Sequence, residues 1–86
     1  MVEFVAKVKN RLGIHARPAA YLVQAAAKFQ ADVTLIKDGL EVNGKSIMGV
    51  MMLAAEKGAE ITVRAVGADA DAAVEKLSSM IQGDFD

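Results

Sequence analysis

Apolar residues recur along this chain with two different periods, and the order in which those periods alternate limits the folds it can adopt. A two-residue repeat indicates a strand with one buried face, and a 3.6-residue repeat indicates an amphipathic helix. Val2, Phe4, Ala6 and Val8 show the first pattern. The whole chain predicts four strands, at 2–8, 33–37, 40–42 and 60–66, and three helices, at 15–28, 47–57 and 70–82.

Turn and capping residues separate these segments. Asp38-Gly39, between two short β-rich segments, predicts a hairpin. Ser46 is a suitable N-cap for the second helix and Gly58 suits its C-terminal stop, while Asp69 can cap the last helix. The order βαββαβα predicts an α+β open-faced β-sandwich, in which a four-stranded antiparallel sheet carries all three helices on one face.

Length and composition exclude several classes of protein. At 86 residues the chain has room for one core, so residues 1–86 are expected to form a single domain. Without cysteine and with one histidine, we expect no disulfide, no metal site and no cofactor. The charged first segment lacks the apolar core of a signal peptide, and the near-apolar run 47–55 is too short to span a bilayer. We therefore expect no membrane insertion and a cytoplasmic location.

Charge is distributed unevenly, although the net charge is only −1. Positive residues are concentrated in 1–30 and negative residues in 67–86. Two solvated faces would account for this pattern, but the basic half could also meet an acidic partner protein. Nucleic acid is not expected as a partner, because the positive charge is sparse and no aromatic stacking motif accompanies it.

His15, the only histidine, lies where a strand pattern stops and a helix pattern starts. Pro18 fits only the first turn of a helix, which places His15 at or beside the N-cap. The unpaired N–H groups of that turn, those of Ala16 and Arg17, and the Arg17 guanidinium suit a transient phosphoryl group. No second acid or base lies nearby in the sequence, so the arrangement favours holding a phosphoryl group and passing it on. The plainer alternative is a surface histidine without chemistry.

Two segments resemble a known family. Residues 13–20, Gly-Ile-His-Ala-Arg-Pro-Ala-Ala, resemble the active-site motif of the HPr family, the histidine-containing phosphocarriers of the bacterial phosphoenolpyruvate:sugar phosphotransferase system. Residues 43–51, Asn-Gly-Lys-Ser-Ile-Met-Gly-Val-Met, resemble the regulatory serine segment of HPr. The length and the order of elements also agree, so the resemblance covers essentially the whole chain.

The resemblance implies a defined role for each segment. Enzyme I, phosphorylated by phosphoenolpyruvate, would donate a phosphoryl group to Nδ1 of His15, and the IIA domains of sugar permeases would receive it. Arg17 would stabilise the phosphoryl group. Ile47, Met48 and Met51 would form the apolar patch that docks both partners. The protein would then be a phosphocarrier rather than an enzyme with its own turnover, and we expect it to be a monomer.

Ser46 has two expected roles. It is a suitable N-cap whatever else it does. The resemblance implies that an ATP-dependent HPr serine kinase/phosphorylase phosphorylates it, with a carbon-catabolite regulator as a further partner. A new negative charge beside the docking patch would repel an acidic partner and slow transfer at His15.

Residues 39–46 also fit G-x-x-x-x-G-K-[ST], the phosphate-binding loop of nucleotide hydrolases. We expect this match to be accidental. Residues 40–42 predict a strand inside the supposed loop, and the chain is too short for the parallel sheet that such a loop requires.

The motifs leave the branch of the phosphorelay open. Arg11-Leu12 resembles the nitrogen-branch paralogue NPr and some proteobacterial HPr proteins, whereas residues 43–51 resemble HPr that is regulated by a serine kinase. An NPr-like regulatory phosphocarrier is therefore the main alternative. A non-catalytic binding module of the split βαβ type is an alternative from another class.

Overall fold

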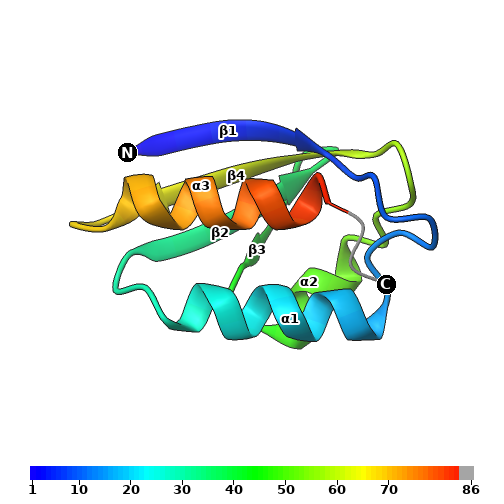
Figure 1. The fold of residues 1–86 in the computed structure, drawn as a ribbon, viewed down its shortest axis with the longest axis horizontal. Coiled ribbons are helices and arrows are strands. Elements are labelled where there is room, and N and C mark those ends of the chain that lie inside the picture. Colours follow the sequence, from blue (N-terminus) through cyan, green and yellow to red (C-terminus); the bar gives the residue numbers. More distant parts are fainter. Residues whose placement is uncertain (84–86) are drawn as a thin grey trace.

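The computed structural model describes residues 1–83 and confirms the predicted order of elements (Figure 1). The strands are β1 (Val2–Lys7), β2 (Asp32–Lys37), β3 (Leu40–Asn43) and β4 (Glu60–Val66), and the helices are α1 (Ala16–Ala27), α2 (Ile47–Met52) and α3 (Ala70–Ile81). Asp84 and Asp86, which belong to the predicted acidic end of the chain, lie outside the described residues.

The four strands form one antiparallel sheet in the order β1-β4-β2-β3. Figure 1 shows the three helices on the same side of this sheet, which leaves the other face open. Val63 of the central strand β4 lies opposite Phe4 of β1 and Leu35 of β2, so the three side chains point to one face. The predicted open-faced sandwich is therefore confirmed.

The core lies between the sheet and the helices. Ile61, Val63 and Ala65 alternate along β4 and are fully buried. Leu22 of α1 and Leu77 of α3 are buried on the helix side of the same cluster. Among residues 1–83, no helix is long and apolar enough to cross a membrane, and no three candidate ligand side chains are grouped for a metal ion.

Phe4 departs from the burial pattern predicted for the first strand. It was expected to share the buried face of Ala6, but it is 46% exposed, whereas Ala6 is fully buried. Phe4 lies on the edge strand β1 and borders an open groove of about 400 Å³ between β1 and α3. The side chain of Phe4 is therefore only partly covered by α3.

Helix α2 is shorter than predicted, and its large apolar residues other than Val50 are exposed. It ends at Met52, and Ala54, with a left-handed φ of 48°, turns the chain before Gly58 is reached. The expected stop at Gly58 was therefore wrong. Four apolar residues of this segment, Ile47, Val50, Met51 and Ala54, follow a helical spacing. Only Val50 among them is buried, and the other three are exposed. A helix of six residues at the margin of the core has room to bury only a narrow face.

The hairpin at Asp38-Gly39 is confirmed, and it excludes a phosphate-binding loop at residues 39–46. Gly39 lies in the turn between β2 and β3, and Leu40–Asn43 is the strand β3. The Lys45 ammonium donates to the carbonyl of Phe29 at 2.8 Å. The segment therefore pairs with β2 instead of wrapping around a phosphate.

Asp69 is the N-cap residue of α3, but its side chain makes no capping hydrogen bond. Its ψ of 26° differs from the extended backbone that lets a capping side chain reach its own helix. The carboxylate instead accepts hydrogen bonds at 2.8 Å from the backbone N–H groups of Gln30 and Ala31. These two donors, Gln30 first, lower the pKa of Asp69. Asp69 therefore ties the start of α3 to the loop between α1 and β2.

Replacing Asp69 with asparagine is expected to destabilise the protein in a pH-dependent manner. Because the pKa of Asp69 is lower in the folded protein, its contribution is complete above the ordinary value of 3.8 and is lost as pH falls through the folded value. Thermal unfolding should show a difference in Tm that is constant from neutral pH to about pH 5 and shrinks below about pH 4. Asp32→Asn, which removes an exposed carboxylate elsewhere, is the control. A difference that stays constant into strong acid would contradict the prediction.

Candidate functional site

His15 is the N-cap residue of α1, as predicted, and its side chain is partly exposed. Its backbone is extended, with φ −87° and ψ −166°, and its carbonyl accepts the first helical hydrogen bond from the N–H of Ala19 at 2.9 Å. The imidazole makes no capping hydrogen bond to the helix. The ring therefore stands at the start of α1 without occupying the helix donors.

The first turn of α1 contains the two backbone donors that the sequence predicts for the site. Within residues 1–83, the N–H groups of Ala16 and Arg17 have no protein acceptor, and Pro18 has no N–H to donate. The turn also contains no acidic residue that would neutralise the positive end of the helix dipole. Backbone donors and positive potential together make this end of the helix suitable for an anion.

Arg17 lies in the same turn, and its side chain is exposed. A guanidinium can donate two parallel hydrogen bonds to the oxygens of a phosphate. The fold thus brings the predicted nucleophile, the two backbone donors and the predicted cation to one end of α1. Together these groups could hold a phosphoryl group and balance its charge.

The loop before His15 packs closely against the segment that follows α2. The N–H of Ile14 donates to the carbonyl of Ala55 at 2.8 Å. Gly13 has a left-handed φ of +74°, and a Cβ built on it would lie 2.5 Å from the Ala55 carbonyl oxygen and 3.0 Å from Glu56 Cα. Gly13 was predicted as part of the motif, but this contact was not, because the two segments meet only in the folded chain.

Ser46 is the N-cap of α2, as predicted, and is partly exposed. Its hydroxyl oxygen accepts a hydrogen bond from the N–H of Gly49 at 3.1 Å. The neighbouring Lys45 ammonium reaches the Phe29 carbonyl just after α1. Helices α1 and α2 pack against each other (Figure 1), so His15 and Ser46 begin two neighbouring helices.

An exposed apolar surface, here called the α2 patch, consists of Ile47, Met48, Met51 and Met52. Met48 is 76% exposed, and Ile47 and Met51, the other two predicted docking residues, are 46% and 44% exposed. Met52, which the sequence reasoning missed, is 63% exposed. Periodicity could not have found it, because a methionine in a helix usually belongs to the core.

Two other exposed apolar side chains were also missed. Leu12, in the loop before His15, is 62% exposed, and Tyr21, one turn after Arg17, is 45% exposed. Leu12 could have been found from the sequence, since a large apolar residue in a predicted turn has no strand or helix face to bury it. Large exposed apolar side chains beside a polar site are typical of protein-interaction surfaces.

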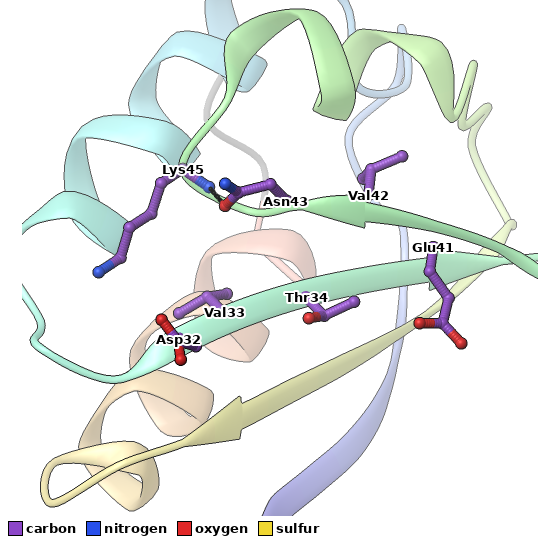
Figure 2. Close-up of a pocket in the computed structure, with 7 residues that line it drawn as sticks. All are labelled: Asp32, Val33, Thr34, Glu41, Val42, Asn43 and Lys45. Carbon is purple, nitrogen blue, oxygen red and sulfur yellow. Dashed lines mark hydrogen bonds between the residues drawn. The ribbon is translucent and has the colours of Figure 1, made fainter.

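Three hollows of the described surface are lined by neither His15 nor Ser46. One hollow has a volume of about 410 Å³ and lies beside the edge strand β3. Its lining side chains belong to β2 and β3, with Lys45 (Figure 2). Two others, of about 400 and 560 Å³, are likewise lined by neither His15 nor Ser46. Small substrates are usually bound in enclosed pockets. His15 is partly exposed and lies outside these three hollows, an arrangement that suits a group delivered by another protein.

Comparison with known proteins gives consistent matches over the chain. The family model described as "PTS HPr component phosphorylation site" matches residues 2–83. The phosphocarrier protein HPr of Xylella fastidiosa (strain Temecula1 / ATCC 700964) is 49% identical over 85 residues, which are 99% of this chain and 96% of that protein. The crystal structure of a phosphocarrier protein HPr from Bacillus anthracis str. Ames has a TM-score of 0.91 at 46% identity and covers 94% of this chain and 96% of that one.

A regulatory relative is similarly close. The crystal structure of the Bacillus subtilis catabolite repression protein Crh, described as a dimer with a swapped domain, is 49% identical with a TM-score of 0.77, covering 95% of this chain and 94% of that one. The monomeric state that we expect is therefore not shared by all similar proteins. The family model, the curated relatives and the solved structures agree over nearly the full length, and the chain belongs to the HPr family of phosphocarrier proteins of the phosphotransferase system.

Proposed function

We propose that this chain accepts a phosphoryl group from phosphorylated enzyme I on Nδ1 of His15 and transfers it to the IIA domains of sugar permeases. The observation that carries the proposal is the position of His15 at the N-cap of α1, beside the N–H groups of Ala16 and Arg17, which have no acceptor among residues 1–83. The chain is a carrier in this scheme, because the phosphoryl group leaves as it arrived and no product is released.

The transfer needs one bond to form and one to break at each step. The lone pair of Nδ1 forms the bond to phosphorus while the bond between phosphorus and the donor breaks, and the reverse exchange occurs at the acceptor. The three phosphoryl oxygens carry the negative charge throughout, and the Ala16 and Arg17 N–H groups with the Arg17 guanidinium would stabilise it. No acid or base of this chain is required to activate water.

A phosphotransfer assay tests the proposal directly. The protein is incubated with phosphoenolpyruvate and enzyme I, and its mass is followed for the addition of one phosphate. The label should be lost in mild acid and retained in base, as expected for phosphohistidine. Absence of any label under conditions in which a known HPr is labelled would favour the alternative, a non-catalytic binding module.

The NPr-like alternative rests on Arg11-Leu12, and Leu12 is 62% exposed just before the site. An exposed side chain in this position would contact a docked partner and help to choose it. Enzyme I proteins of the sugar and nitrogen branches should be compared as donors in parallel assays. Faster transfer from the nitrogen-branch donor would favour the NPr-like alternative. The proposed role would then be nitrogen or carbon signalling instead of sugar uptake.

We also propose that phosphorylation of Ser46 by an HPr serine kinase/phosphorylase inhibits this transfer and provides a link to carbon-catabolite regulation. Ser46 begins the helix that carries the α2 patch, so a phosphate there would lie beside the proposed docking surface. Its charge would oppose an acidic partner.

Ser46→Asp is expected to lower the rate of enzyme I-dependent phosphorylation by about tenfold, because like charges at an interface oppose association. Aspartate can still accept the hydrogen bond from the Gly49 N–H, so α2 should be retained. Rates are measured at several protein concentrations by mass spectrometry. Ser46→Ala separates loss of the cap from gain of charge, and Ser79→Asp adds the same charge on the exposed face of α3. Equal rates for Ser46→Asp and wild type would refute the inhibition.

The assembly and location belong to the same proposal. We infer a monomer that meets its partners transiently in the cytoplasm, where enzyme I and the IIA domains act. Light scattering during size-exclusion chromatography measures the assembly, and a stable dimer would align this chain with the assembly described for Crh.

A further inference from the structure

Asn10 is a fully buried side chain in the loop between β1 and α1, with an exposure of 0%. Burying an amide is costly unless the amide is hydrogen-bonded. Its Nδ2 donates to the carbonyl of Gly13 at 2.8 Å, while its Oδ1 accepts no hydrogen bond from residues 1–83. The only polar contact of this side chain within the described structure is therefore with the backbone that leads into His15.

Asn10 holds Gly13 through both of its backbone groups. The N–H of Gly13 donates to the backbone carbonyl of Asn10 at 2.9 Å, and its carbonyl accepts from the Asn10 amide. The carbonyl of Gly13 and the N–H of Ile14 belong to one peptide unit, and that N–H donates to the Ala55 carbonyl at 2.8 Å. Asn10 and Ala55 thus fix opposite edges of the peptide immediately before the Ile14–His15 peptide.

This arrangement constrains the backbone on the N-terminal side of His15, whereas α1 constrains it on the C-terminal side. After His15 the chain is fixed by α1, beginning with the bond between the Ala19 N–H and the His15 carbonyl. Before it, Gly13 is a residue with wide conformational freedom, and its geometry here depends on its contacts. A misplacement of about 1 Å in a reacting group can lower a transfer rate by about 100-fold.

We propose that Asn10 is a positioning residue for phosphoryl transfer, which sets the placement of the His15 imidazole by holding the Gly13–Ile14 peptide. The inference rests on the proposed function of His15. It assigns to the buried amide a role in the rate of transfer, distinct from the docking of partners, which we assign to the exposed α2 patch.

The test replaces Asn10 with leucine, which has nearly the same shape and fills the site without the Nδ2 donor. With enzyme I as the donor, Asn10→Leu is expected to lower kcat for phosphorylation by about tenfold or more and to change KM by no more than about twofold, because the α2 patch lies outside the altered loop. The ¹H–¹⁵N signals of the His15 ring should also shift. Asn10→Ala is the second variant, and thermal unfolding checks that each variant is folded at the assay temperature.

Ser78→Ala is the matched control. Ser78 is a second buried polar residue, 6% exposed, whose Oγ has no partner among the described residues, and it lies on α3. Its loss should change neither kcat nor the His15 signals. A folded Asn10→Leu protein with wild-type kcat and unshifted ring signals would overturn the inference, as would an equal fall in kcat for Ser78→Ala. If the wild-type protein takes no label, the proposed function itself fails, and the positioning role fails with it.

Discussion

Alanine at position 15 is expected to abolish enzyme I-dependent incorporation of phosphate while leaving the protein folded. The chain has no other histidine and no cysteine, so no second side chain offers a comparable nucleophile near neutral pH. His15 is partly exposed at the N-cap and does not belong to the hydrophobic core, so its replacement should change the free energy of unfolding by no more than about 1 kcal/mol. Intact-mass analysis after incubation with phosphoenolpyruvate and enzyme I measures the first effect, and thermal unfolding measures the second.

Gln24→Ala is a suitable control for this experiment. Gln24 is exposed on the same helix, so the change tests whether any alteration of the α1 surface lowers labelling. Its label should match that of the wild type. An acid-labile label on His15→Ala at the wild-type rate would show that the phosphoryl group is carried by another residue.

Gly13→Ala is expected to destabilise the protein by about 2–5 kcal/mol. The left-handed backbone costs an alanine about 1–2 kcal/mol, and overpacking against fixed backbone adds about 1–3 kcal/mol. The overpacking arises because the new Cβ would lie 2.5 Å from the Ala55 carbonyl oxygen. Relief of this contact would require the loop to move away from Ala55, so transfer at His15 should fall as well. Urea unfolding monitored by circular dichroism gives the free energy.

Gly39→Ala distinguishes the two contributions. Gly39 also has a left-handed φ, +83°, but a Cβ there meets nothing within 4 Å. Gly39→Ala should lower the free energy of unfolding only by the cost of the left-handed backbone, about 1–2 kcal/mol. It should leave phosphoryl transfer unchanged. If the two variants lose equal stability, the contact between Gly13 and Ala55 does not determine the loop structure.

Local physical chemistry explains why most elements could be predicted. Alternation along 60–66 indicated a strand with one buried face, and Ile61, Val63 and Ala65 are fully buried. Pro18 cannot donate a backbone hydrogen bond, which restricted it to the first helical turn and placed His15 at the N-cap. Each of these constraints acts between residues that are neighbours in the sequence, so the sequence is sufficient to detect it.

Periodicity could not predict the outward orientation of α2. A 3.6-residue repeat identifies residues that share a helix face, but it does not say whether another element covers that face. The helix buries Val50 and leaves the α2 patch exposed, although Ile47 and Met51 lie at helical spacing from Val50. Their exposure agrees with the docking role that the family resemblance implies, which remains a proposal.

The sequence by itself determined the order of elements, the fold class and the place of His15 at a helix start, because backbone conformation, capping and hydrophobic period depend on near neighbours. The tertiary structure alone decided which distant segments are bonded to one another, including those that hold the site. Asp69 could have capped its own helix. In the folded chain its carboxylate instead accepts hydrogen bonds at 2.8 Å from the backbone N–H groups of Gln30 and Ala31. In the same way Ala55 meets the loop before His15 only after folding. Hydrogen bonds between segments that are distant along the chain depend on how these segments pack in the folded protein, and local sequence patterns do not predict that packing.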